Sequence, residues 1–249
     1  MPCATLRFYA ELNDFLPFRG RFRTIERSFA TRTSIKDLIE AAGVPHTEVD
    51  LALANGESVD FTHHVQDGDR ISVYPVFESI DIGAVTKVRP KPLRDLRFVL
   101  DVHLGRLAAY LRLAGFDAVY GNAFEDGDLA AVAASGRVLL TRDRGLLKRR
   151  VVTRGYWLRA TRPRVQLAEV LRRFDLTEAV RPFCRCLRCN ALVHSVRKAD
   201  VCADLPPRTR QHYEEFSRCS GCGKVYWRGG HFTGLRALLE HAIDHARAG

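Results

Sequence analysis

The feature that most constrains this chain is a pair of cysteine motifs in its last third. Cys186-x-x-Cys189 and Cys219-x-x-Cys222 each place two thiols at a spacing that lets one turn point both sulfurs at a single ion. Four thiolates form a closed tetrahedral site that suits structural Zn²⁺ and leaves no position for a reacting water. The pattern therefore predicts a zinc ribbon within residues 181–249, whose folding depends on the metal.

The segment between the two motifs is longer than in a short ribbon. It holds 29 residues, so we expect the chain to leave the metal site, pass through Pro206-Pro207 and return. Cys184 is an alternative to Cys186 as a ligand, although only Cys186 repeats the spacing of the second motif. We expect Cys3, Cys184 and Cys202 to be ordinary thiols, because nothing at the start of the chain resembles a secretion signal. Three histidines are further alternative ligands: His194, His212 and His231.

The front of the chain reads as a small α+β domain. Apolar and polar residues alternate at 4–9 and 23–30, which predicts two strands, and residues 34–42 predict a helix ended by Gly43. Further strands are predicted at 51–54, 57–61 and 70–75. Residues 1–80 therefore form a predicted ββαββ-type unit.

This order resembles the β-grasp, ubiquitin-like fold of small sulfur carriers. Two turn sequences carry the resemblance, Leu-Ala-Asn-Gly at 53–56 and Asp-Gly-Asp-Arg at 67–70. Sulfur carriers act through a C-terminal Gly-Gly, whereas this chain runs on as Pro75-Val-Phe-Glu-Ser-Ile. We therefore expect an interaction or structural module with a protein partner rather than a carrier. Its linker is predicted at 81–95, where the prolines of Lys87–Pro92 disfavour helix and central strand.

Residues 96–180 predict an open parallel α/β sheet with flanking helices. Short strands are predicted at 97–101, 118–120, 137–141 and 156–158, and helices at 104–111, from Asp126 or Asp128, and at 165–174. Ligand sites of such sheets lie at the carboxyl ends of the strands. Asp101 and Asp143 stand at such ends, and Asp126 and Asp128 begin a helix that this topology brings to the same edge.

Carboxylates that converge at one edge repel one another unless a cation neutralises them. Mg²⁺ or Mn²⁺ prefers such hard oxygen ligands, and the chemistry that follows is phosphodiester hydrolysis by a metal-activated water. Each acid also has a structural explanation. Asp126 and Asp128 are favoured helix N-caps, whereas Asp101 and Asp143 directly follow apolar strands, where loss of hydration begins to cost.

One stretch carries a more specific resemblance. Phe98-Val-Leu-Asp101-x-x-Leu-Gly-Arg106-Leu-Ala-x-Tyr-Leu-Arg112-x-x-Gly-Phe-Asp117, followed by Asp126-x-x-Leu129 and Gly-Arg-Val-Leu-Leu-Thr141-Arg-Asp143, resembles the Mut7-C family of PIN-like RNase domains. The resemblance implies metal-dependent ribonuclease activity, with Asp101, Asp126 and Asp143 at the acidic site. A fourth acid is common in PIN domains, and Asp128 and Asp117 are the candidates. Proteins of similar layout carry a ubiquitin-like domain in front.

The net charge of +10 is unevenly distributed. Residues 1–80 hold 8 lysines and arginines against 12 acids, and residues 81–249 hold 31 against 17. Between Arg142 and Arg164 nine basic residues accompany one acid, with Tyr156 and Trp157 among them. This basic strip attracts phosphate backbones or is a solvated face. Four arginines are the predicted RNA contacts: Arg106 and Arg142, near the acids, and Arg149 and Arg150. Arg106 and Arg142 could equally form salt bridges to neighbouring acids.

The end of the chain has two further patterns. Tyr226, Trp227 and Arg228 could stack on and grip single-stranded RNA, or Trp227 could pack on the catalytic domain. Leu235, Leu238, Leu239, Ala242 and Ile243 form one apolar stripe, which predicts a docked helix.

Together these features predict a soluble, cytoplasmic, zinc-containing ribonuclease that uses Mg²⁺ or Mn²⁺. Charges interrupt every apolar stretch before membrane-spanning length, so we expect no membrane partner. The alternative is a non-catalytic RNA-binding zinc-ribbon adaptor regulated through its ubiquitin-like domain, in which the acids are only caps.

Overall fold

The computed structural model describes residues 1–75, 85–88 and 96–248. Its contacts divide the chain into two compact units, residues 1–95 with 130–157 and residues 96–129 with 158–249. The predicted extension of the last β-grasp strand beyond Pro75, and most of the predicted linker, lie outside the described residues. None of the helices within the described ranges has the length and apolar character needed to cross a membrane.

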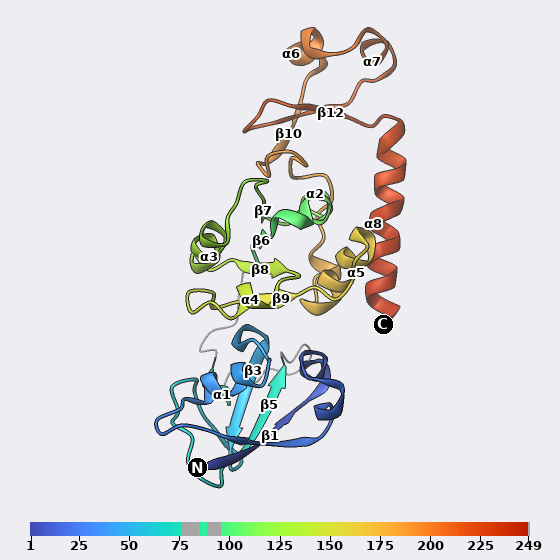
Figure 1. Ribbon diagram of the computed structural model, residues 1–249. Coiled ribbons are helices and arrows are strands. Elements are labelled where there is room, and N and C mark those ends of the chain that lie inside the picture. Colours follow the sequence, from blue (N-terminus) through green and yellow to red (C-terminus); the bar gives the residue numbers. More distant parts are fainter. Residues whose placement is uncertain (76–84, 89–95, 249) are drawn as a thin grey trace. The chain divides into compact units, whose positions relative to one another are not determined.

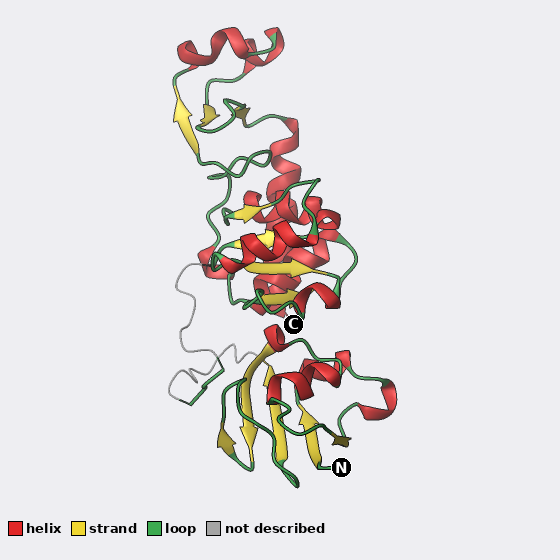
Figure 2. Cartoon of the chain, turned by 60° about the vertical axis from the view of Figure 1, so that its left-hand side comes forward, coloured by secondary structure: helices red, strands yellow, loops and turns green. Residues whose placement is uncertain are grey.

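A five-stranded sheet with a helix on one face forms the N-terminal part of the first unit (Figures 1 and 2). Its strands are β1 (Cys3–Phe8), β2 (Thr24–Ser28), β3 (Val49–Ala54), β4 (Glu57–Ser58) and β5 (Arg70–Pro75). The order is β2-β1-β5-β3-β4, with β1 and β5 parallel and the other pairs antiparallel. This is the predicted β-grasp arrangement. Three short 3-10 helices complete it, η1 (Ala10–Phe15), η2 (Phe18–Gly20) and η3 (His46–Glu48).

Helix α1 (Ile35–Ala41) begins where its sequence predicts a start. The Ser34 hydroxyl accepts a hydrogen bond from the Asp37 amide at 3.2 Å, and an Asp37 carboxylate oxygen accepts one from the Ser34 amide at 3.4 Å. This capping box satisfies two amides that a helix leaves without partners. The helix then buries Ile35 and Ile39 in the same core as Leu6 and Val73 of the sheet.

Residues 130–157 also belong to the first unit. They contain the end of α3 (Asp126–Ala134), then β8 (Val138–Thr141), α4 (Arg144–Leu147) and β9 (Gly155–Trp157), with β8 and β9 parallel. Polar contacts join this segment to the β-grasp residues. The two ring nitrogens of His46 lie 2.6 Å from a Glu40 carboxylate oxygen and 2.9 Å from the Val152 carbonyl oxygen. The Lys148 ammonium donates to the Glu40 carbonyl at 2.9 Å.

The second unit begins with β6 (Phe98–Leu100), which pairs in parallel with β7 (Ala118–Val119). With β8 and β9 these strands form a four-stranded sheet in the order β7-β6-β8-β9, as predicted for an open α/β sheet. Helices α2 (Gly105–Leu113), α5 (Pro163–Arg173) and α8 (Gly230–Ala248) pack on one another in the second unit (Figure 1). The 3-10 helices η4 (Val102–Leu104) and η5 (Thr177–Ala179) lie between these elements. Helix α8 is longer than the apolar stripe predicts.

A three-stranded antiparallel sheet carries the cysteine motifs. It consists of β10 (Val193–Val196), β11 (Phe216–Cys219) and β12 (Val225–Trp227) in that order. Between β10 and β11 the chain makes the predicted excursion, through α6 (Lys198–Val201), η6 (Cys202–Asp204) and α7 (Pro207–His212). Val201, Leu205 and Phe216 form a small core of their own beneath it.

Gly115 is the most constrained glycine of the second unit. Its φ is +99°, and a Cβ at this position would lie 2.2 Å from the Arg181 carbonyl oxygen. Gly136 has a similar φ of +88° but open space around it. Alanine would therefore strain the backbone at both positions. Only at Gly115 would its side chain also collide with another segment, at Arg181.

We predict that Gly115→Ala lowers the free energy of unfolding by about 3 kcal/mol or more, because the backbone around Arg181 must move. Gly136→Ala should cost about 1 kcal/mol, the strain alone. Urea unfolding of both variants measures the two losses. Equal losses would contradict the close approach at Gly115.

Candidate functional site

Asp101 is a buried carboxylate at the end of a buried strand. Phe98, Val99 and Leu100 of β6 are fully buried, and Asp101 directly after them is only 8% exposed. A carboxylate oxygen accepts a hydrogen bond from the His103 amide at 3.4 Å and so caps η4. Burying a charge costs free energy unless partners compensate it, and this hydrogen bond is one such partner.

Asp126 and Asp128 lie in the first turn of α3, and both are exposed. An Asp128 carboxylate oxygen accepts a hydrogen bond from the Glu125 amide at 3.0 Å. Negative charge is favourable at this end of a helix because it faces the positive end of the helix dipole. The capping explanation of Asp128 is therefore well supported by its geometry.

Asp143 follows β8 by two residues and is exposed. Its carboxylate accepts a hydrogen bond from the Gly145 amide at 2.7 Å, which caps α4, and its own amide donates to the Thr141 hydroxyl at 2.9 Å. These two bonds fix the backbone and the carboxylate at the end of the strand. The sequence did not predict α4, because a four-residue helix is too short to show a helical period.

One group of candidate metal ligands is compact. Over the described ranges, Cys186, Cys189, Cys219 and Cys222 form the sole group of three or more potential ligands whose ligand atoms lie within 4.8 Å of one another. The predicted divalent-metal site at the aspartates thus remains a prediction. The alternative thiol at Cys184 and the three histidines proposed as substitutes are outside this group.

The four sulfurs are held in two matching turns. The Cys186 and Cys222 sulfurs are 3.6 Å apart, and those of Cys189 and Cys219 are 3.3 Å apart. Backbone amides donate to the first sulfur of each motif, from Cys189 to Cys186 at 3.5 Å and from Cys222 to Cys219 at 3.4 Å. Amide donors stabilise thiolates, so this donor set is consistent with structural zinc.

The charges of these thiols depend on one another. Burial raises the pKa of Cys186, but hydrogen bonds from the Tyr226 hydroxyl and backbone amides outweigh it and lower the pKa to about 6. For Cys189 the Ala191 amide favours the thiolate, but burial and the neighbouring thiols raise the pKa to about 12. Protein groups alone therefore ionise only part of the cluster at neutral pH. A divalent cation bound there would supply the positive charge that favours ionisation of all four thiols.

Arg112 joins the first cysteine turn to the sheet of the second unit. This α2 side chain is 5% exposed, and its guanidinium donates to the Ala118 carbonyl at 2.8 Å and to the Leu187 and Arg188 carbonyls at 3.0 Å. Burial lowers the pKa of Arg112, and the thiols of the cluster oppose this shift. The guanidinium thus satisfies three backbone acceptors at once.

Asn190, directly after the first motif, makes a second set of contacts. Its amide nitrogen donates to an Asp117 carboxylate oxygen at 2.8 Å, and its amide oxygen accepts from the Ala118 backbone at 3.0 Å. Arg185 lies 4.0 Å from the other Asp117 oxygen and donates to the Gly115 carbonyl at 3.1 Å. Asp117, a candidate for the fourth acid, therefore takes part in docking the cysteine turn. The sequence shows only that an asparagine follows the first cysteine motif. It does not indicate that this asparagine binds Asp117.

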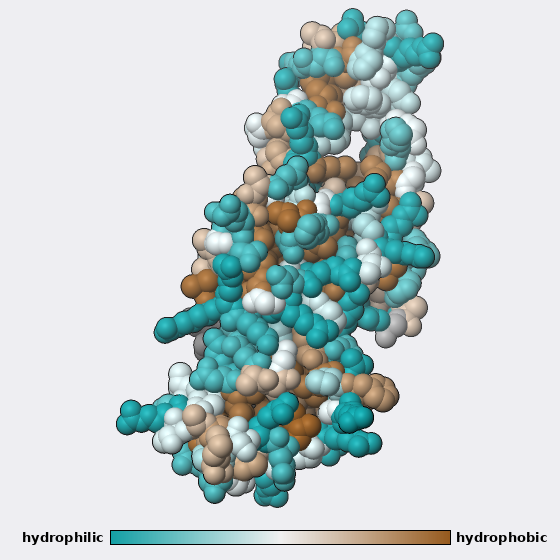
Figure 3. Space-filling model, viewed as in Figure 1, coloured by the Kyte–Doolittle hydropathy of each residue, from teal (hydrophilic) through white to brown (hydrophobic). Residues whose placement is uncertain are grey.

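Some residues of the basic strip are exposed, and another contacts aromatic rings of the first unit. Arg142, Arg149 and Arg150 are exposed, as an RNA contact requires. Arg144 instead lies over the rings of Trp157 and Phe15, at 3.9 Å and 5.1 Å from the ring centroids. The strip is therefore partly occupied by contacts inside the first unit. Hydrophilic side chains dominate the face of the molecule drawn in Figure 3.

The aromatic residues after the second motif have structural partners. The Tyr226 hydroxyl lies 3.1 Å from the Cys186 sulfur and accepts from the Leu187 amide at 3.2 Å, so Tyr226 supports the cluster. Arg228 forms an ion pair with Glu215 at 3.3 Å. Trp227 is 36% exposed and remains a candidate for stacking.

Comparison with known proteins assigns families to both parts of the chain. Residues 96–239 match the family described as Mut7-C RNAse domain, and residues 1–81 match Mut7-C ubiquitin. No curated protein matches the chain. Among solved structures, the small archaeal modifier protein 1 of H. volcanii matches with 17% identity and a TM-score of 0.25. That match covers 30% of this chain and 98% of the modifier protein.

The hydrogen bonds of Arg112 predict a large stability effect. Arg112→Met keeps much of the side-chain volume but leaves three carbonyls without their donor, so we expect the free energy of unfolding to fall by about 3 kcal/mol or more. The exposed Arg188 provides a control, and Arg188→Met should change it by less than about 0.5 kcal/mol. Urea unfolding, followed by a signal from the second unit, measures both. Comparable small effects would show that the guanidinium does not hold the cysteine turn.

Proposed function

Because the chain belongs to the Mut7-C RNase domain family, we propose that it is a metal-dependent ribonuclease that hydrolyses RNA phosphodiester bonds. The family match of residues 96–239 is the observation that carries this proposal. The uneven charge of the chain agrees with it, because residues 81–249 carry 31 basic side chains against 17 acids. Such an excess attracts the phosphate backbone.

We assign the catalytic metal to Asp101, Asp126 and Asp143, with Asp128 as the candidate fourth ligand. Carboxylate oxygens are the ligands that Mg²⁺ and Mn²⁺ prefer, and Asp101 directly follows the buried strand β6. Asp101 follows the carboxyl end of β6, and Asp143 follows that of β8. Ligands of open α/β sheets bind at such strand ends, which supports the assignment.

A bound divalent ion would lower the pKa of a water molecule and neutralise charge that develops on the phosphate. The protein's own part in this chemistry is to fix the carboxylates. The His103 amide orients Asp101 and the Gly145 amide orients Asp143, each through a carboxylate oxygen. We assign both carboxylates to the metal as oxygen ligands.

We assign RNA binding to Arg106, Arg142, Arg149 and Arg150. All four are exposed, and guanidinium groups match phosphate with two parallel hydrogen bonds. Contacts of this kind position RNA without reading its sequence. We further infer that the ubiquitin-like domain binds a protein partner, since its five-stranded sheet lies outside the nuclease match.

The alternative function is a non-catalytic RNA-binding adaptor. The hydrogen bonds that Asp101, Asp128 and Asp143 accept from backbone amides favour it, because these bonds alone account for an aspartate at each position. The two functions differ in whether metal-dependent cleavage occurs.

We predict that Asp143→Asn and Asp101→Asn each reduce Mn²⁺-dependent RNA cleavage by about 100-fold or more, because each removes a ligand charge while preserving shape. RNA affinity in EDTA should change less than about twofold. Asp128→Asn should be as severe if Asp128 is the fourth ligand and mild if it only caps α3. Cleavage rates measured on end-labelled RNA decide this. Variants at Asp101 and Asp143 that cleave as fast as the parent would favour the adaptor.

We also predict that the purified chain holds about one zinc ion, bound by the four clustered thiols. Cys219→Ser should lose the zinc and destabilise the second unit, because metal-binding energy there is folding energy. Cys202→Ser is the matched control, since Cys202 is a half-buried thiol outside the cluster. Elemental analysis of the three proteins provides the measurement. Parent protein prepared without chelators and found to lack zinc would refute the assignment.

A further inference from the structure

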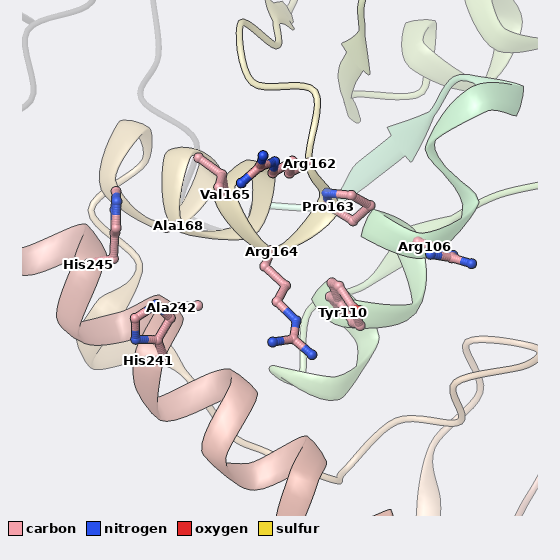
Figure 4. A pocket seen from close by; sticks show the side chains of 10 residues that line it. All are labelled: Arg106, Tyr110, Arg162, Pro163, Arg164, Val165, Ala168, His241, Ala242 and His245. Carbon is pink, nitrogen blue, oxygen red and sulfur yellow. The ribbon is translucent and has the colours of Figure 1, made fainter.

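A pocket of about 400 Å³ lies in the second unit among α2, α5 and α8 (Figure 4). Its polar lining is entirely basic or aromatic, consisting of Arg106, Tyr110, Arg162, Arg164, His241 and His245. The other lining residues are apolar, and no acid lines the pocket among the residues that the structure describes. Arg106 is a predicted RNA contact and Arg162 and Arg164 lie in the basic strip, whereas the sequence did not single out Tyr110, His241 and His245. Three sequence segments contribute to it, so only the folded chain brings them together.

The arginines of this pocket have no acidic partner in the described part of the chain, whereas five other arginines of the second unit have one. Ion pairs join Arg197 to Asp200, Arg218 to Asp204, Arg228 to Glu215, Arg236 to Glu240 and Arg247 to Glu178. Glu240 and Asp244 neighbour the two histidines along α8 but are not part of the pocket lining. Uncompensated like charges around a hollow are relieved by an anion.

Hydrogen-bond donors of the α5 start and of the arginine side chains lie around this pocket. Arg162, Pro163 and Arg164 form the start of α5, where the helix dipole favours negative charge. In Figure 4 the Arg164 side chain extends from this turn into the space between α2 and α8, with Tyr110 on one side and His241 on the other. Guanidinium groups present paired donors that fit phosphate oxygens, and a tyrosine ring offers a face on which a base can stack.

We propose that this pocket binds a phosphate group of RNA with its adjoining nucleotide. The inference rests on the proposed ribonuclease function and adds a second substrate-binding site to the one assigned to the metal. The volume lies in the range of small-ligand sites, so one nucleotide unit is the ligand that we expect. The phosphate is either internal or at an RNA end, and both sources share the same chemistry.

The test is equilibrium binding of fluorescent single-stranded RNA in EDTA, which measures affinity without cleavage. Three oligonucleotides of one sequence are compared, with a 5′-phosphate, with a 3′-phosphate and with neither. The double variant Arg162→Gln/Arg164→Gln should bind about tenfold more weakly. The slope of its log affinity against log salt should be shallower by about 0.7 for each phosphate that it no longer neutralises. The single variant Arg164→Gln should show part of this weakening. Both arginines are exposed, so folding should be unaffected.

Arg172→Gln is the matched control, because Arg172 is an exposed arginine on the same helix that does not line the pocket. It should change affinity by less than about twofold. An equal weakening with all three oligonucleotides supports an internal phosphate, and a weakening confined to one phosphorylated end supports a terminal phosphate. The proposal is overturned if the double variant binds all three like the control, or if the parent binds none of them at low salt. Cleavage assays of the aspartate variants remain a separate test of the nuclease.

Discussion

The buried guanidinium of Arg112 is the interaction on which the second unit depends most. The Arg112 side chain, on α2, is only 5% exposed. Its guanidinium donates hydrogen bonds to carbonyls of β7 and of the first cysteine turn. Burial of its charge is costly, and three carbonyl acceptors together with the nearby thiolates compensate that cost. Helix, strand and cysteine turn are therefore fixed together. Asn190 and Arg185 reinforce the same junction through Asp117 and Gly115.

This junction gives the cysteine cluster a role distinct from chemistry. Four thiols in two matching turns could supply all four ligands of a structural zinc ion, which would leave no open position for water. Its effect on the nuclease would be mechanical, because the turn that binds it also contacts the first residue of β7. In the proposed function, the carboxylates that follow β6 and β8 bind the catalytic metal, and the basic side chains bind the RNA backbone.

Local sequence patterns predicted most of this fold. The strands of the β-grasp sheet, the buried strands β6 and β8 and the cysteine pairs all follow from periodicity or spacing that a few neighbouring residues determine. Contacts between distant segments were not predictable in this way. Arg112 meets carbonyls 75 and 76 residues away, and the basic pocket combines α2 with α5 and α8. Nothing in the period of α2 distinguishes a docking arginine from a solvated one. Asp101 and Asp143 were identified as candidates because the ends of apolar strands can be predicted from sequence. Whether several aspartates bind one metal ion cannot be predicted in that way.

The most direct test of the ribonuclease proposal is a metal titration of the unaltered protein on RNA labelled at each end. Zinc-loaded protein, freed of loosely bound cations, is incubated with single-stranded and structured RNA while Mn²⁺ is added. We predict no cleavage before the addition and cleavage that rises with Mn²⁺ to saturation, as a metal-activated water requires. Protein that binds the RNA yet leaves it intact at every Mn²⁺ concentration would contradict the ribonuclease and leave an RNA-binding adaptor.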